Sequence, residues 1–172
     1  MLPTKELLLH ACRAEPREDH PLLRCIHLLA GLHERDLRAD PAVDDIAIGR
    51  ARLMHTIDHW VATQFPTPRG GAHMHTETLG SVLDRLARHS AFAHAALLLA
   101  PKRQVHEAWE RLAELSLGYE DLAIDLAAGA RRLPDLATTD FEHAFRPGLR
   151  RHNRRFFVVG SHRNASIITL SA

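Results

Sequence analysis

The densest group of residues able to do acid–base chemistry lies between positions 73 and 85. His75 and Glu77 come just before a helical stretch, and Asp84 follows Glu77 by seven residues. That spacing places the two carboxylates on one line of a helix, about 10 Å apart. The line lies roughly opposite the apolar stripe of the stretch, so we expect a solvated face. If another surface covers this face, Glu77, Asp84 and His75 could act as general bases.

Several basic or polar residues could hold an anion beside these bases. Arg50 falls inside the apolar stripe of a predicted helix, where a guanidinium needs a carboxylate, carbonyl oxygens or an anionic ligand. We favour an internal salt bridge or a side chain that reaches solvent, with an anion site as the alternative. Arg69, next to Gly70 and Gly71, could bind an anion with backbone donors, although a flexible loop is the simpler interpretation. The remaining candidates for anion or substrate binding are Arg85 and Tyr119.

A metal or cofactor site has little support in the sequence. His55 and His59 are one helical turn apart and could hold a metal with Asp58 or with a distant ligand. However, neither an HExxH motif nor an ExxH motif of the di-iron type is present. The two cysteines, Cys12 and Cys25, allow no four-cysteine zinc site. The chain also has no P-loop and no GxGxxG motif, so we expect neither a metal nor a cofactor.

Helices are the elements that must position these side chains. Apolar residues recur at three-and-four spacing along most of the chain, and prolines mark several breaks. We expect Thr76 to cap the helix that carries Asp84. Four substantial helices with short connections favour an antiparallel bundle, so we predict an all-α domain over residues 1–134. The predicted helices cover residues 4–13, 21–37, 41–65, 77–97 and 102–131.

The last part of the chain, residues 135–172, differs in charge and pattern. Residues 141–172 contain six arginines and one acid, a net charge of +5, against −4 for the remaining residues. Two β-prone runs, 155–159 and 165–170, predict a short hairpin. We expect this basic extension to dock on the bundle or on a partner. The candidate docking surface is a stripe of acids in the predicted helix 102–131, although a solvated face is the simpler interpretation: Glu107, Glu110, Glu114, Asp121 and Asp125.

Composition narrows the class of protein. With 172 residues, 45% hydrophobic and 25% charged, the chain fits one globular domain rather than a disordered segment. It has no run of eighteen apolar residues, and its apolar start is too short for a signal peptide, so we expect a soluble cytoplasmic protein without a membrane anchor. Clustered arginines with nearby aromatics could bind nucleic acid. Because the rest of the chain is acidic and no nucleic-acid-binding module is present, we do not expect that partner.

Three segments resemble the actinobacterial branch of a family known only as domain of unknown function 4254. They are RARLMHTIDHWV, HTETLGSVLDRLA and LGYEDLAIDLAAGARRLP, and the resemblance covers roughly residues 20–134. The most specific motifs are H-T-E-T-x-G followed by D-R-x-A, with Y-x-D-L and R-R-L-P later in the chain. The arginine-rich extension lies outside them.

The resemblance implies a role in secondary metabolism. Such proteins are similar to small helical proteins of antibiotic gene clusters, among them the small partner subunit of azinomycin-type aziridine synthases. Those enzymes close a three-membered ring by attack of an amine on a carbon that bears a sulfate ester. The resemblance therefore implies a cofactor-independent subunit that pairs with a different chain, as in a heterodimer, and acts on a small anionic intermediate. His75, Glu77 or Asp84 could take the amine proton, and Arg50, Arg69 or an arginine of the extension could hold the sulfate. The alternative is a helical scaffold without chemistry of its own that stabilises a biosynthetic partner.

Overall fold

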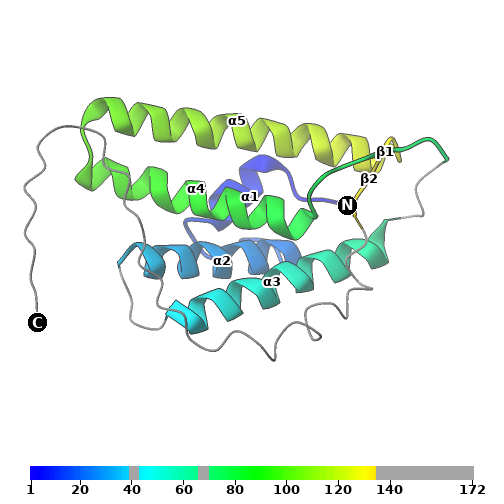
Figure 1. Cartoon of the computed structure of the whole chain (residues 1–172), viewed down its shortest axis with the longest axis horizontal. Helices are drawn as coiled ribbons and strands as arrows, with labels where there is room; N and C mark the ends of the chain where they lie inside the picture. Colours follow the sequence, from blue (N-terminus) through cyan, green and yellow to red (C-terminus); the bar gives the residue numbers. More distant parts are fainter. Residues whose placement is uncertain (39–42, 66–69, 135–172) are drawn as a thin grey trace, which may run out of the picture. The chain divides into compact units, whose positions relative to one another are not determined.

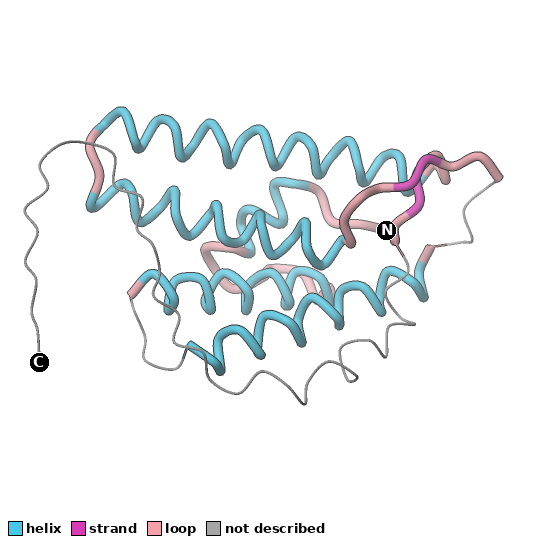
Figure 2. Tube along the Cα trace, viewed as in Figure 1, coloured by secondary structure: helices cyan, strands magenta, loops and turns pink. Residues whose placement is uncertain are grey.

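The computed structural model describes residues 1–38, 43–65 and 70–134. The described residues form helices with two short strands, which confirms the predicted all-α fold (Figures 1 and 2). The predicted extension 135–172 with its hairpin, and also Arg69, lie outside the described residues. The elements are α1 (Lys5–Ala11), α2 (Pro21–Leu37), α3 (Val43–Gln64), β1 (His73–Met74), α4 (Leu79–Leu99), α5 (Lys102–Ala127) and β2 (Arg131–Arg132).

Helix α4 is the central element of the bundle, because it packs against α2, α3 and α5. Figure 1 shows α4 and α5 running antiparallel, with α2 and α3 on the other side of α4. The core consists of aliphatic side chains contributed by these helices, among them the fully buried Ile26, Ile57, Leu83 and Leu86. None of the described helices has the length and apolarity needed to cross a membrane.

Three helix ends follow directly from the sequence. Pro21 occupies the first turn of α2, and the His20 side chain accepts a hydrogen bond from the backbone N–H of Leu22. This helix ends at Leu37, as predicted. Helix α1 is capped by Thr4, whose side chain accepts from the backbone N–H of Leu7.

Two other predicted ends were wrong. Helix α4 is capped by Thr78 rather than Thr76, because the Thr78 hydroxyl accepts from the backbone N–H of Ser81 at 3.1 Å. Helix α5 ends at Ala127, several residues before the predicted end at position 131. Just beyond it, Gly129 adopts a positive φ of 67°, a conformation that turns the chain out of the helix and that glycine adopts without strain.

The two short strands connect the segment before α4 to the end of α5. His73 pairs with Arg131 and Met74 with Arg132 in a parallel arrangement. The backbone N–H of His75 continues this pairing by donating to the carbonyl of Arg132 at 2.8 Å. The chain therefore enters α4 from a fixed position beside the C-terminal end of α5.

Candidate functional site

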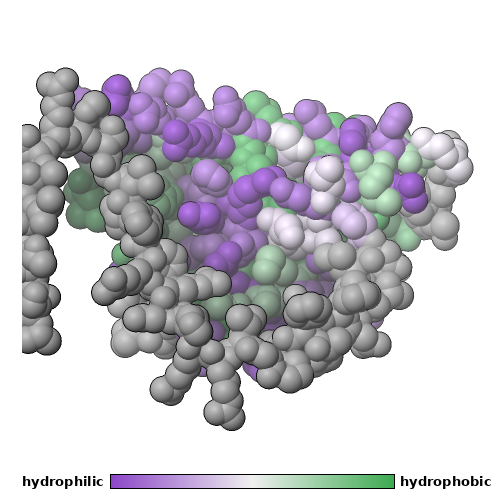
Figure 3. Space-filling view, viewed as in Figure 1, coloured by the Kyte–Doolittle hydropathy of each residue, from purple (hydrophilic) through white to green (hydrophobic). Residues whose placement is uncertain are grey.

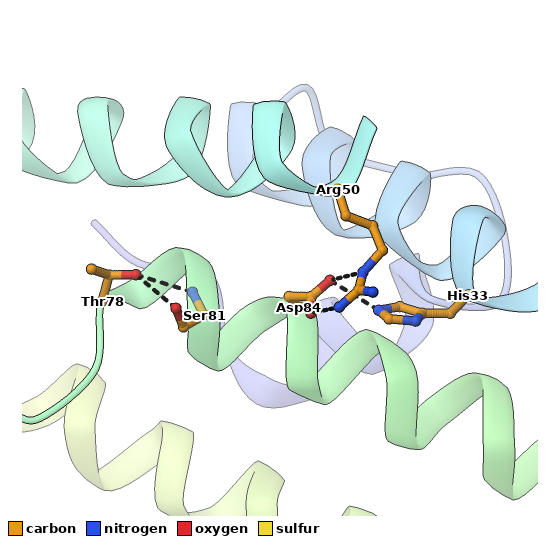
Figure 4. Close-up of polar contacts among 5 residues, drawn as sticks. All are labelled: His33, Arg50, Thr78, Ser81 and Asp84. Carbon is orange, nitrogen blue, oxygen red and sulfur yellow. Dashed lines mark hydrogen bonds and ion pairs between the residues drawn. The ribbon is translucent and has the colours of Figure 1, made fainter. Parts of the chain in front are cut away.

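Asp84 lies in the interior between three helices, so the predicted solvated face was wrong for this residue. It is 7% exposed and is turned towards α2 and α3 (Figure 4). Arg50 of α3 donates to it at two points, from Nε to Oδ1 at 2.9 Å and from Nη2 to Oδ2 at 2.6 Å. His33 of α2 donates from Nε2 to Oδ1, also at 2.9 Å. The internal salt bridge predicted for Arg50 is thus confirmed, and the three side chains join three helices.

The partners of Asp84 control its charge. Burial alone would raise the pKa of the Asp84 carboxyl, but the hydrogen bonds from Arg50 and His33 outweigh burial and lower it to about 2. The same contact raises the pKa of Arg50. Asp84 is consequently a carboxylate at neutral pH whose oxygens are already engaged. Such a group is a weak proton acceptor, and its geometry is that of a buried structural pair.

Close packing between α3 and α4 explains the glycine of the H-T-E-T-x-G motif. A Cβ at Gly80 would lie 2.5 Å from the carbonyl oxygen of Met54 and 2.9 Å from Asp58 Oδ2. The absence of a side chain lets the Gly80 backbone N–H donate to Asp58 Oδ1 at 2.7 Å. Burial raises the pKa of Asp58, although this hydrogen bond opposes the shift. Asp58 therefore serves the contact between the two helices.

The histidines on α3 do not join Asp58 in a metal site. His55 and His59 are exposed, whereas Asp58 is half-buried against α4. Across the described part of the chain, no group of three His, Cys, Asp or Glu side chains is arranged to hold a metal ion.

His75 and Glu77 lie together at the start of α4, apart from Asp84. His75 Nδ1 is 2.8 Å from the carbonyl oxygen of Glu77 and 3.2 Å from its backbone nitrogen. The Glu77 carboxylate accepts from Arg85 Nη1 at 2.9 Å, and both side chains keep more than a third of their surface in contact with solvent. The structure thus brings together three of the predicted site residues, His75, Glu77 and Arg85, whereas Asp84 is buried and engages Arg50 and His33 instead.

Tyr119, a predicted binding residue, occupies a structural position. It is 1% exposed, and its hydroxyl donates to the carbonyl of Pro3 at 2.7 Å. Burial raises the pKa of its hydroxyl group. The contact fixes the N-terminal segment against α5, and a binding role for Tyr119 stays a prediction.

The acidic stripe of α5 is partly neutralised by neighbours. Two of its five acids already pair with an arginine and a third contacts a histidine, so its charge is a weaker attraction for a basic segment than the sequence indicates. Docking of the extension on it stays a prediction. The pairs are Glu107 with Arg103, Glu110 with His106 and Asp125 with Arg131.

His33 is the member of the Asp84 cluster that the site prediction missed. The residue stands in the apolar stripe of α2 and is 3% exposed. A histidine in such a stripe needs a polar partner, and this was the available signal. Which residue that partner would be depends on the tertiary packing of α2 against α4.

Comparison with known proteins gives one family match. A protein-family model described as protein of unknown function (DUF4254) matches residues 33–134, more than half of the chain. The matched region contains the Thr78 cap, the Gly80 contact, Asp84 with its partners, and Tyr119. No curated protein and no solved structure matches the chain.

Proposed function

We propose that this chain, which belongs to the family of proteins of unknown function DUF4254, is a helical subunit that binds a different protein chain in a biosynthetic assembly. The buried cluster of Asp84, Arg50 and His33 maintains the fold in this proposal. The resemblance to small partner subunits of biosynthetic enzymes supports a different chain, rather than a second copy, as the partner. We also propose that the chain acts in secondary metabolism, comes from an actinobacterium and is located in the cytoplasm.

The observation that carries the proposal is the apolar C-terminal end of α4. Leu98 and Leu99 are each 86% exposed, and Leu97 and Phe92 are more than half exposed. Figure 3 shows hydrophobic residues gathered at the end of the bundle where α4 leads into α5. Covering one leucine side chain is worth about 1.5–3 kcal/mol, so a partner with an apolar surface would gain binding energy here.

Co-expression with the products of adjacent genes tests this proposal. We expect a stable hetero-complex with one of them, which survives size-exclusion chromatography and gives the mass of both chains. The double substitution Leu98→Ser with Leu99→Ser should abolish the complex without changing the urea unfolding midpoint of the isolated chain. Ile124→Ser on α5 is the matched control, since Ile124 is also exposed, at 62%, but lies on another helix.

Three results would overturn the proposal. The first is a complex that persists in the double variant, because the apolar end of α4 would then not be the interface. The second is assembly of the wild-type chain into a homodimer only. The third is the absence of a complex with any neighbouring gene product.

The finer proposal concerns chemistry, namely aziridine ring closure. The amine nitrogen would form a bond to carbon, the carbon–oxygen bond to the sulfate ester would break, and a base would accept the amine proton. The base that this chain would contribute is Glu77, because its carboxylate is accessible to solvent whereas the oxygens of Asp84 are engaged. Arg85, which holds Glu77, would lie beside the departing sulfate.

Activity of the reconstituted complex tests this assignment. Glu77→Gln should remove turnover while leaving the unfolding midpoint and the assembly unchanged. Asp84→Asn serves as the contrast, since its expected effect is a loss of stability. If the Glu77→Gln complex keeps full turnover, Glu77 is not the base, and this assignment is wrong.

A further inference from the structure

A groove between α4 and α5 collects basic side chains from both helices. It has a volume of about 360 Å³ and is lined by Arg85 and His89 of α4 and by Arg111, Glu114 and Leu115 of α5. The groove is open to solvent along much of its extent, so a ligand bound there would keep part of its surface in contact with water. In Figure 3, hydrophilic residues cover much of the surface over these two helices.

Arg111 brings a guanidinium group to this groove, although Glu107 and Glu114 lie one turn away from it on the same helix. Among residues 1–38, 43–65 and 70–134, no carboxylate forms an ion pair with Arg111. Arg85 shares its charge with Glu77 through a contact that leaves its side chain 45% exposed. The two guanidinium groups come from different helices, so a ligand between them would be held from both sides.

His89 reports the electrostatic character of the groove. Burial lowers the pKa of its imidazole, and the positive charges of Arg88, Arg85 and Arg111 lower it further. Glu114 is the acidic side chain that lines the groove with it. The charges of these arginines act on the imidazole in the same direction, and a bound anion would oppose them.

We propose that this groove binds a small organic anion through a sulfate-type or phosphate-type group, with Arg111 and Arg85 as the charged contacts. Guanidinium groups suit such oxyanions because their planar donors match two oxygens at once. Leu115 offers an apolar contact for the organic part of the ligand. The negative charge of Glu114 lowers the affinity for a simple anion. The groove shares Arg85 with the aziridine chemistry proposed above, whereas none of its lining residues belongs to the apolar end of α4, so binding can be tested in the isolated chain.

An NMR titration of the full chain with inorganic sulfate, inorganic phosphate and chloride at matched ionic strength tests the site. Sulfate or phosphate should shift the signals of Arg111 and His89 in a saturable way, and chloride should not. Arg111→Ala should weaken binding about tenfold, the value expected for loss of one charge-assisted contact. Glu114→Gln should tighten it, which provides a test in the opposite direction. Arg103→Ala is the control, because Arg103 is an arginine of α5 that does not line the groove.

The imidazole signals of His89 give a second readout. A bound dianion should raise the pKa of His89, because it offsets the charges of Arg85, Arg88 and Arg111. Tighter binding of sulfate indicates a sulfate ester as the ligand, and tighter binding of phosphate indicates a phosphate ester. Equal affinity for the two anions indicates that the groove binds tetrahedral dianions in general. The proposal fails if chloride produces the same shifts, if Arg111→Ala binds as tightly as the wild type, or if the shifts occur away from the groove.

Discussion

Arg50 and Asp84 form a two-point ion pair that joins α3 to α4, with N–O distances of 2.9 and 2.6 Å. The side chain of Asp84 is 10% exposed and that of Arg50 is 30% exposed. His33 adds a contact from α2 to the same carboxylate. One acidic residue therefore satisfies donors from two neighbouring helices, and its removal would leave both without their partner.

Acid should destabilise the protein through Asp84. Its pKa is about 2 in the folded chain and near 4 in an unfolded one. Between these values the unfolded chain takes up a proton that the folded chain does not, so stability present above about pH 4 is lost as the pH falls towards 2. Urea unfolding between pH 2 and 5 measures how the free energy of unfolding changes with pH. In Asp84→Asn this slope should be smaller, because up to one fewer proton is taken up on unfolding. Equal slopes in the two proteins would show that Asp84 has the same pKa folded and unfolded.

The Gly80 contact gives a second prediction. Gly80→Ala should destabilise the protein by about 1–3 kcal/mol, because the added Cβ meets the backbone of Met54 and α3 must move. Gly118→Ala on α5 is the matched control, since its Cβ would have no neighbour within 4 Å. It should instead stabilise the chain by about 0.5–1 kcal/mol, the usual gain from alanine in a helix. Thermal or urea unfolding of both variants measures the difference, and equal effects would refute the close approach.

The cap of α4 gives a third prediction. Thr78→Ala should lower the free energy of unfolding by about 1 kcal/mol, because the Ser81 backbone N–H loses its acceptor. Thr76→Ala should change the unfolding free energy by less than about 0.5 kcal/mol, since Thr76 is exposed and outside the helix. If Thr76→Ala lowers the free energy of unfolding more than Thr78→Ala does, the helix starts at the position expected from the sequence, with Thr76 as its cap.

The sequence predicted the helices well because their signals are local. Pro21 marks the start of α2, and apolar spacing predicts the core-facing side of each helix. The start of α4 depended on a distant contact instead. His75 is held in extended pairing by Arg132, so the chain turns at positions 76–77 and the helix begins only after Thr78. A distant partner of this kind is not visible in the local pattern.

The site was harder to predict than the helices. The place of Arg50 in an apolar stripe correctly indicated a salt bridge, but its partner Asp84 was expected on a solvated face. Helix α4 contacts neighbours on several sides, so it buries Gly80 and Asp84 as well as its leucine stripe. The number of neighbours around a helix is a property of the tertiary fold. For the same reason, Arg85 was a candidate for anion binding, but its neighbours His89 and Arg111 in the groove were not.

A double-mutant cycle of Arg50→Met and Asp84→Asn, followed by urea unfolding at neutral pH, tests the structural role of the ion pair most directly. Each single substitution should lower the free energy of unfolding. For Asp84→Asn we expect a loss of about 3 kcal/mol, near the lower end of the range for broken buried pairs, because Arg50 keeps some contact with water. The double variant should lose less than the sum, with a coupling energy of about 2 kcal/mol. Additive effects, with Asp84→Asn as stable as the wild type, would contradict this account and return Asp84 to the list of candidate catalytic residues.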